Sequence, residues 1–147
     1  MAARRPLVRV GGKISQLPQG DTVEGAGGGA ASVAIQASEA LAAGDFVEIY
    51  SSSGAKCRKA DAQTPREAKG YVLSAALQGA DAQVFFLGGV NDKLSGLVPG
   101  EDYYLSLTPG GVSSVAPSGT GQARQSLGVA VSPTALLTLP GMFIELE

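Results

Sequence analysis

Histidine and tryptophan are absent from this chain, and cysteine occurs only once. Without histidine, Ser-His-Asp triads, Cys-His dyads and histidine-based metal sites cannot form within one chain. A single cysteine also excludes an intrachain disulfide framework. Charged residues are scarce as well, at 16% of the chain against about 25% in average proteins. These absences exclude several classes of enzyme and metal site, but they indicate no function.

Glycine and proline are abundant instead, at 29 of 147 residues, where average usage would be roughly 12%. The length suits one domain, since domains typically span ~100 to 200 residues, and two separate cores are not expected. With 44% apolar residues the chain can bury a core, because intrinsic disorder accompanies low hydrophobicity and high net charge. The composition therefore predicts a folded, turn-rich domain.

The charges are unevenly distributed, although the net charge is only −2. Residues 1–20 contain bases and no acid, whereas residues 100–147 contain four acids and one base. A weakly acidic chain has no overall attraction for nucleic acid or for an anionic membrane, since both recruit basic surfaces. No apolar run approaches the ~18 residues of a membrane span, and the start lacks the apolar region of a secretory signal. Synthesis and use in the cytosol are therefore expected.

The first 29 residues are predicted to form an arm. Leu7–Val10 and Lys13–Leu17 are predicted strands joined by Gly11-Gly12, because glycine tolerates the positive φ of a two-residue hairpin turn. A glycine-rich joint follows the hairpin and offers no side chains to anchor it. Since an isolated hairpin is marginally stable in water, we expect the arm to become ordered by contact with another surface. Residues 30–147 are predicted to form the β-rich domain.

From Ser32 onward, short β-rich runs alternate with turn residues. Such regular strands predict an all-β fold, a compact antiparallel β-sandwich or barrel. Within Phe46–Tyr50, the strand period of two places Val47 and Ile49 on one face, so this strand is expected to be half buried. The predicted strands are Val33–Ile35, Phe46–Tyr50, Tyr71–Leu73, Ala82–Leu87, Tyr103–Leu107, Leu127–Val131 and Met142–Leu146, with Val112–Val115 as a return strand beside Tyr103–Leu107.

Turn and helix signals refine this fold. Pro99-Gly100 and Pro109-Gly110 each predict a type II turn, because proline fixes φ at the first central position and glycine supplies the positive φ of the second. Gln36–Ala43 is the one stretch with good helix propensity, but Gly44 and Asp45 would end a helix almost at once. At most a single helical turn is expected there.

Several segments of the domain share a pattern of glycines, tyrosines and short apolar runs. They are Gly70-Tyr-Val-Leu73, Val84-Phe-Phe-Leu-Gly88, Ser95-Gly-Leu-Val-Pro-Gly100, Tyr103-Tyr-Leu-Ser106, Thr108-Pro-Gly-Gly-Val112 and Gln125-Ser-Leu-Gly-Val-Ala130. This pattern, which covers about residues 32–146, resembles small capsid decoration (cement) proteins of tailed bacteriophages and related modules in tail-fibre proteins. Because the chain consists of the module and an arm, without a long shaft, decoration is the favoured resemblance.

The resemblance implies a non-enzymatic virion protein that binds the outer surface of an icosahedral capsid and bridges subunits of a major capsid protein. It implies homo-oligomers, with trimers favoured over dimers, and assembly in the cytoplasm of a bacterial host. No cofactor, metal, nucleic acid or membrane is expected as a partner. The alternative is a tail-fibre or head-exposed adhesin that binds host glycans. The candidate capsid-docking residues of the arm are Arg4, Arg5, Leu7, Arg9, Lys13, Ile14 and Leu17.

A cysteine between two basic residues and a glycine-rich segment each resemble part of a known functional site, but each lacks the other residues that such a site needs. Cys57 lies between Lys56 and Arg58, and neighbouring cations can lower the pKa of a thiol. No histidine is present to act as its base, so we interpret it as a strand cysteine beside a solvated basic edge. Gly25–Gly29 shares only its glycines with a phosphate-binding loop, because the P-loop lysine and hydroxyl residue are missing. We interpret this segment as a flexible joint.

Carboxylates and tyrosines near the Pro-Gly turns are the remaining candidates. Asp92, Glu101 and Asp102 are of a type used in glycoside hydrolysis and calcium binding, but no calcium-loop spacing accompanies them, so solubility and inter-subunit pairing are expected. Tyr103 and Tyr104 alternate along one strand, which predicts one in the core and the other as an inter-subunit contact or, alternatively, a sugar-stacking platform.

The basic arm is expected to dock on an acidic protein surface, because its four charges without aromatics are a weak nucleic-acid signal.

Overall fold

The computed structural model describes residues 7–10, 13–16 and 31–147. Strands β1 (Leu7–Val10) and β2 (Lys13–Gln16) pair antiparallel as a two-stranded sheet of their own. These are the two strands predicted for the arm, which confirms them. Leu17, the Gly11-Gly12 turn and the glycine-rich joint lie outside the described residues.

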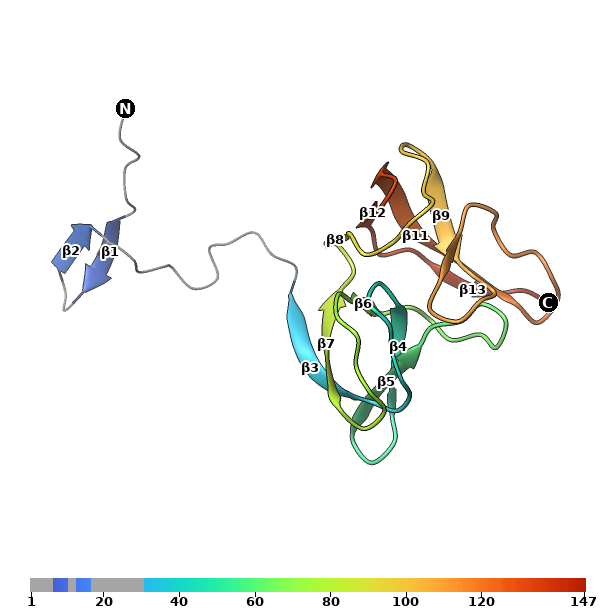
Figure 1. Ribbon diagram of the computed structural model, residues 1–147, viewed down its shortest axis with the longest axis horizontal. Coiled ribbons are helices and arrows are strands. Elements are labelled where there is room, and N and C mark those ends of the chain that lie inside the picture. The colour runs from blue at the N-terminus through green and yellow to red at the C-terminus, as the bar shows by residue number, and fades with distance from the viewer. Residues whose placement is uncertain (1–6, 11–12, 17–30) are drawn as a thin grey trace.

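Five strands close into a small barrel, in the order β3-β5-β4-β6-β7 (Figure 1). All of its pairs are antiparallel except β3 with β5, which run parallel where Gln36 and Ala37 lie beside Lys56 and Cys57. Small and branched apolar side chains fill the interior. The barrel strands are β3 (Ser32–Ala37), β4 (Phe46–Ser51), β5 (Ala55–Lys59), β6 (Gly70–Val72) and β7 (Asp81–Phe86).

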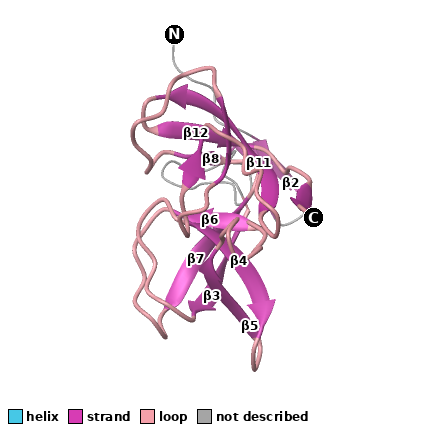
Figure 2. Cartoon of the chain, turned by 90° about the vertical axis from the view of Figure 1, so that its right-hand side faces the viewer, coloured by secondary structure: helices cyan, strands magenta, loops and turns pink. Residues whose placement is uncertain are grey.

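A second, antiparallel sheet lies beside the barrel, in the order β10-β9-β11-β12-β8. Figure 2 shows its strands above those of the barrel. The described residues form strands and no helix, so the all-β prediction is confirmed. The strands are β8 (Val90–Asn91), β9 (Asp102–Leu105), β10 (Val112–Ser113), β11 (Ala123–Ser132) and β12 (Ala135–Thr138), and β13 (Phe143–Glu145) pairs with the start of β11.

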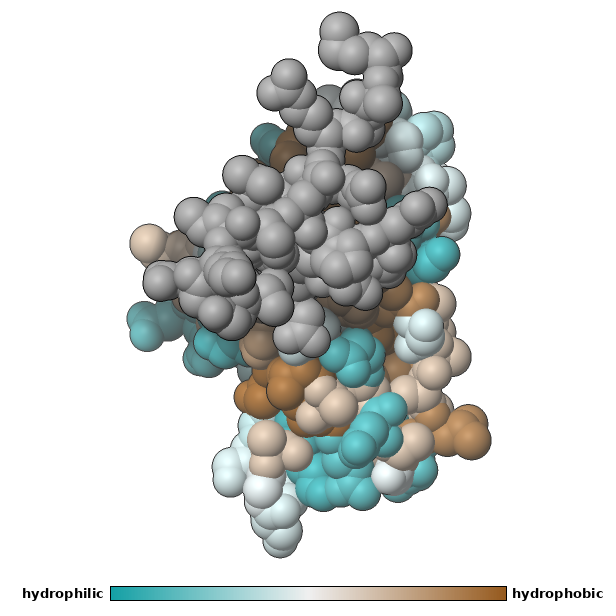
Figure 3. All heavy atoms as spheres, turned by 90° about the vertical axis from the view of Figure 1, so that its left-hand side faces the viewer, coloured by the Kyte–Doolittle hydropathy of each residue, from teal (hydrophilic) through white to brown (hydrophobic). Residues whose placement is uncertain are grey.

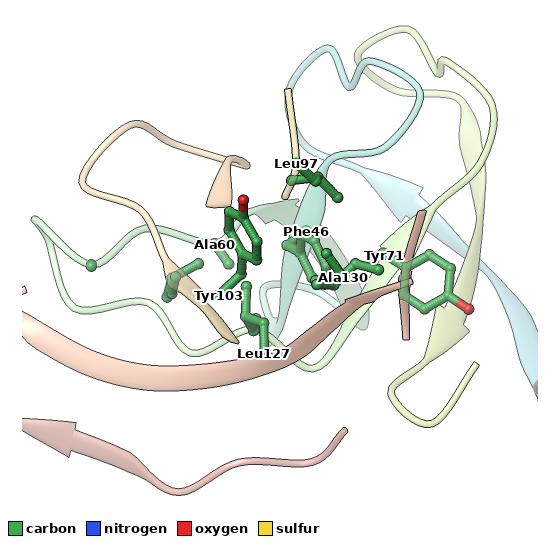
Figure 4. Close-up of a cluster of buried hydrophobic side chains, with 11 residues drawn as sticks. Phe46, Ala60, Tyr71, Leu97, Tyr103, Leu127 and Ala130 are labelled. Atoms are coloured by element: carbon green, nitrogen blue, oxygen red, sulfur yellow. The ribbon is translucent and has the colours of Figure 1, made fainter. Parts of the chain in front are cut away.

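Strands β4 and β6 are covered on both faces. Phe46 and Tyr71 belong to a buried cluster between the barrel and the second sheet, whereas their neighbours Val47 and Val72 belong to the barrel interior. The expectation of a half-buried strand at Phe46–Tyr50 is therefore wrong at its start. The single core expected from the length is also wrong, because there are two buried clusters, but both are built on the same two strands. Figure 4 shows the inter-sheet cluster, to which the second sheet contributes Tyr103, Leu127 and Ala130.

Both Pro-Gly pairs form the predicted type II turns. The glycines Gly100 and Gly110 have φ of 90° and 80°, which is the positive φ that this turn requires at its second central position. In each turn the N–H of the last residue donates to the C=O of the first at 3.1 Å, from Glu101 to Val98 and from Gly111 to Thr108.

Two stretches differ from their local signals. The helix propensity of Gln36–Ala43 is not realised, because its first two residues belong to β3 and Leu41 forms a bridge with Ala76. The strand predicted for Tyr103–Leu107 ends two residues early, so Leu107 leaves the buried face and is 42% exposed. In the first stretch pairing with a distant segment decides the structure, whereas β9 ends where the chain enters the local turn, in which the N–H of Ser106 donates to the C=O of Gly111 at 3.1 Å.

Buried polar side chains join the two halves of the fold. The amide of Gln125, which is 1% exposed, accepts from the N–H of Ala68 and donates to its C=O, each at 2.9 Å. Asn91, which is fully buried, donates to the C=O of Gly44 at 2.9 Å. These bonds tie the second sheet to loops of the barrel.

Replacing Gln125 by leucine is expected to lower the free energy of unfolding by about 2 to 4 kcal/mol. The N–H and C=O of Ala68 would stay buried without partners, and each such loss costs about 1 to 3 kcal/mol. The matched control is Gln83→Leu, which removes an exposed amide bonded to the Ser32 hydroxyl at 2.8 Å and should change stability by less than about 0.5 kcal/mol. Urea unfolding compares them, and equal stability of the two variants would contradict a joining role for Gln125.

Candidate functional site

The predicted docking arm is described only in its hairpin. Three of the seven candidate docking residues, Arg4, Arg5 and Leu17, lie outside the described residues. Docking by the arm therefore stays a prediction, although its strands are confirmed. Four of its seven candidate contact residues lie in the hairpin: Leu7 and Arg9 in β1, Lys13 and Ile14 in β2.

The two adjacent tyrosines lie on opposite faces of β9, as predicted. Tyr103 is 5% exposed and belongs to the inter-sheet cluster, and its hydroxyl accepts a hydrogen bond from the N–H of Val98 at 2.9 Å. Tyr104 is half buried and lies on the outer side of the sheet. Tyr103 is therefore a core residue, and only Tyr104 is available for an external contact.

Tyr104 lines an open cleft of about 320 Å³ together with Glu101, Asp102 and Ser114. Both carboxylates are exposed, and neither forms an ion pair with another described residue. The cleft thus combines one aromatic ring with two free acceptors and a hydroxyl. This composition suits a cationic or hydroxyl-rich contact.

Asp92 does not join the carboxylates of this cleft. It follows β8, at the opposite edge of the sheet from the β9 side, roughly 14 Å away by strand spacing. Its carboxylate forms an ion pair with Lys93 at 3.9 Å. Among the described residues, no three acidic or cysteine side chains gather as metal ligands. The three carboxylates singled out in the sequence are therefore not one site.

Cys57 lies in the barrel interior. It is fully buried, and its thiol donates to the C=O of Ile35 at an Sγ to O distance of 3.6 Å. Burial raises the pKa of the Cys57 thiol, which disfavours the thiolate that reactive cysteines require. The adjacent Arg58 pairs instead with Glu48 at 2.7 Å. Cys57 is thus a strand cysteine beside a partly exposed basic residue, as interpreted from the sequence.

The outer face of the second sheet carries an apolar row that the sequence did not indicate. Directly opposed residues of neighbouring strands point to the same face, and such pairing links Asp102, Val129, Leu137 and Val90 across β9, β11, β12 and β8. We call these four residues the outer row. Their chain neighbours are buried on the core side: Tyr103, Ala130, Leu136 and Asn91.

Apolar residues are unusual at these outward positions. A one-sided antiparallel sheet normally alternates apolar residues inside with polar residues outside. Here Val90 is 45% exposed, and Val131, which lies beside the row on β11, is 54% exposed. β9 and β11 were among the predicted strands, but β8 and β12 were not, so the row could not be assembled from the sequence. A short apolar run at Ala135–Thr138 was the available signal for β12.

Comparisons with known proteins identify no relative. The sequence matches no protein-family model, and no curated protein and no solved structure shows detectable similarity to the chain. In the part of the chain that the structure describes, no helix has the length and hydropathy needed to cross a membrane.

Proposed function

We propose that this protein is a structural virion component that binds the outer surface of an icosahedral phage capsid. There it stabilises the shell by bridging neighbouring subunits of the major capsid protein. The observation that carries the proposal is the separate β1–β2 sheet in a basic N-terminal segment, beside a β domain with its own two buried clusters. An isolated hairpin is marginal in water, so the arm is expected to pack on another surface, and on the assembled particle that surface is the capsid.

The mechanism of this role is mechanical. Packaged DNA presses capsid subunits apart, and a clamp that contacts several subunits opposes their separation. Each bound contact raises the effective concentration of the next, and a homo-oligomer, with trimers favoured over dimers, multiplies the contacts. Because the protein binds the assembled shell in preference to its separated subunits, binding stabilises the shell by mass action. Such a role needs no catalytic group.

Electron microscopy of particles that carry the protein tests this location. Decoration predicts many copies that follow the capsid lattice. A few copies confined to the tail would contradict decoration and support an adhesin. The Tyr104 cleft favours the adhesin as the second candidate, because an aromatic ring beside two carboxylates is suited to stacking and hydrogen bonding with a sugar.

Charge reversal in the arm tests its part in docking. The double variant Arg4→Glu and Arg5→Glu is expected to bind capsids about 5- to 30-fold more weakly at low salt, taking about 0.5 to 1 kcal/mol for each reversed charge. The difference should shrink near 1 M salt, where screening acts over about 3 Å. Cosedimentation with capsids measures the binding.

The matched control is Lys69→Glu with Lys93→Glu, which changes the net charge equally on two exposed lysines of the domain. It should bind capsids nearly as well as the natural protein. Equal loss of binding in both double variants would contradict a specific role for the arm.

A further inference from the structure

We propose that the outer row is, in the free protein, the docking site of the chain's own N-terminal segment, residues 1–17. Figure 3 faces the side on which β3 lies in Figure 1, and it shows hydrophobic surface there among polar areas. The inference concerns the protein without any partner, and it does not depend on the capsid proposal.

The row is a partly exposed apolar surface, and the segment contains several apolar residues. Val90 and Val131 are about half exposed, and Val129 and Leu137 are partly exposed between them. Apolar side chains that lie side by side on one sheet face offer a surface on which a hairpin can pack. The segment is apolar at alternating and adjacent positions, and a two-stranded hairpin gains stability by packing on another sheet. Its apolar residues after Pro6 are Leu7, Val8, Val10, Ile14 and Leu17.

The charges of the two surfaces are complementary. The row ends at Asp102, with Glu101 next to it, and neither carboxylate pairs with a described cation. Residues 1–17 contain four bases and no acid. Opposite charge at one end of an apolar contact fixes its orientation more than its strength. The acidic end of the row therefore selects a basic occupant.

The size of the row fits a hairpin better than a folded domain. With strands about 4.8 Å apart and residues about 3.4 Å apart, β8, β12 and β11 present a surface of roughly 10 by 13 Å. The four-residue strands β1 and β2 have nearly the same extent. A stable interface between two folded copies buries about 800 Å² on each partner, which is several times this area. The row is thus too small for a second domain.

The connection also favours the chain's own segment. The described chain resumes at Ala31, whose C=O accepts a hydrogen bond from the N–H of Phe86 at 2.9 Å, and Phe86 lies four residues before Val90 of the row. The entry point is therefore within about 20 Å of the row, whereas residues 18–30 can span about 43 Å when extended. A tether of this kind gives effective concentrations near the millimolar range, above that of a second copy in dilute solution.

Disulfide trapping in the full-length protein tests this contact. Leu137→Cys is combined with Val10→Cys or with Ile14→Cys, which occupy alternate register positions of the hairpin, so that one pair can form whichever side meets the row. The native Cys57 is fully buried. Mild oxidation at micromolar protein, followed by non-reducing electrophoresis and peptide mass spectrometry, is expected to show an intramolecular bond in one of the two pairs.

The control combines the same arm cysteines with Leu77→Cys, which is 77% exposed on the loop between β6 and β7. The row should cross-link at least tenfold more than this control. Equal yields, or bonds formed only between two chains, would overturn the proposal. Val131→Cys replaces Leu137→Cys should that variant fold poorly. Adding Glu101→Lys and Asp102→Lys should reduce the yield severalfold, and an unchanged yield would overturn the charge argument.

Discussion

Replacing Gly128 by alanine is expected to lower the free energy of unfolding by about 3 to 5 kcal/mol. Gly128 has a φ of 143°, and a Cβ there would lie 2.0 Å from the backbone oxygen of Leu137. Positive φ costs a residue with a side chain roughly 1 to 2 kcal/mol, and overpacking adds about 1 to 3 kcal/mol. The backbone cannot move aside, because Gly128 pairs with Thr138 on one side and Tyr103 on the other.

Thermal and urea unfolding measure this effect, which should appear as a melting temperature lower by roughly 10 °C. The matched control is Gly54→Ala, where φ is 101° but no atom lies within 4 Å of the added Cβ. It should cost only the backbone strain, about 1 to 2 kcal/mol. If both variants lost equal stability, the close approach of β11 and β12 would not be the cause.

Deleting residues 1–25 is expected to leave a folded β domain that binds capsids at least a hundredfold more weakly. Both buried clusters consist of residues beyond Ser32, so folding does not require the arm. The loss of binding follows from multivalency, since removing one of two linked contacts removes an avidity gain of about 10² to 10⁴. Circular dichroism measures folding, and cosedimentation with capsids measures binding.

Measuring both folding and capsid binding of the deletion variant distinguishes loss of the fold from loss of docking. A melting temperature within a few degrees of the full chain, together with weak binding, supports the arm as the docking element. An unfolded product would place the hairpin in the core of the domain. A folded product with full occupancy on capsids would show that the arm is dispensable for attachment.

Strands with strong local patterns were predictable from the sequence. The Phe46–Tyr50 run is rich in β-branched and aromatic residues, and the Pro-Gly turns on both sides of β9 formed as their residues require. The face assignment within β4 was incomplete because a strand shared by two clusters buries neighbours on both faces. A period of two cannot reveal that the second face meets another sheet.

The missed strands β5, β8 and β12 are short, and β5 and β8 have weak apolar patterns. β5 contains one interior residue, Cys57, among polar neighbours, and β8 has only two residues. β5 pairs mainly with the preceding strand β4 across a short turn at residues 52–54, whereas β8 pairs with β12, which comes much later in the chain. The parallel contact of β3 with β5 is likewise a long-range feature that no turn signal specifies.

The candidate site shows the same limit. The sequence placed Tyr103 and Tyr104 on opposite faces, and the structure confirms this and buries Tyr103. It could not separate Asp92 from Glu101 and Asp102, because the intervening strands β11 and β12 come from later in the chain. For the same reason the outer row was visible only after the pairing of four strands was known.

Calorimetry of capsid particles with and without this protein tests the central proposal most directly. Particles that lack the protein should lose their shell in a transition at lower temperature, and adding the full-length protein back should restore the higher transition. Identical transitions in the presence and absence of the bound protein would contradict a stabilising role on the capsid.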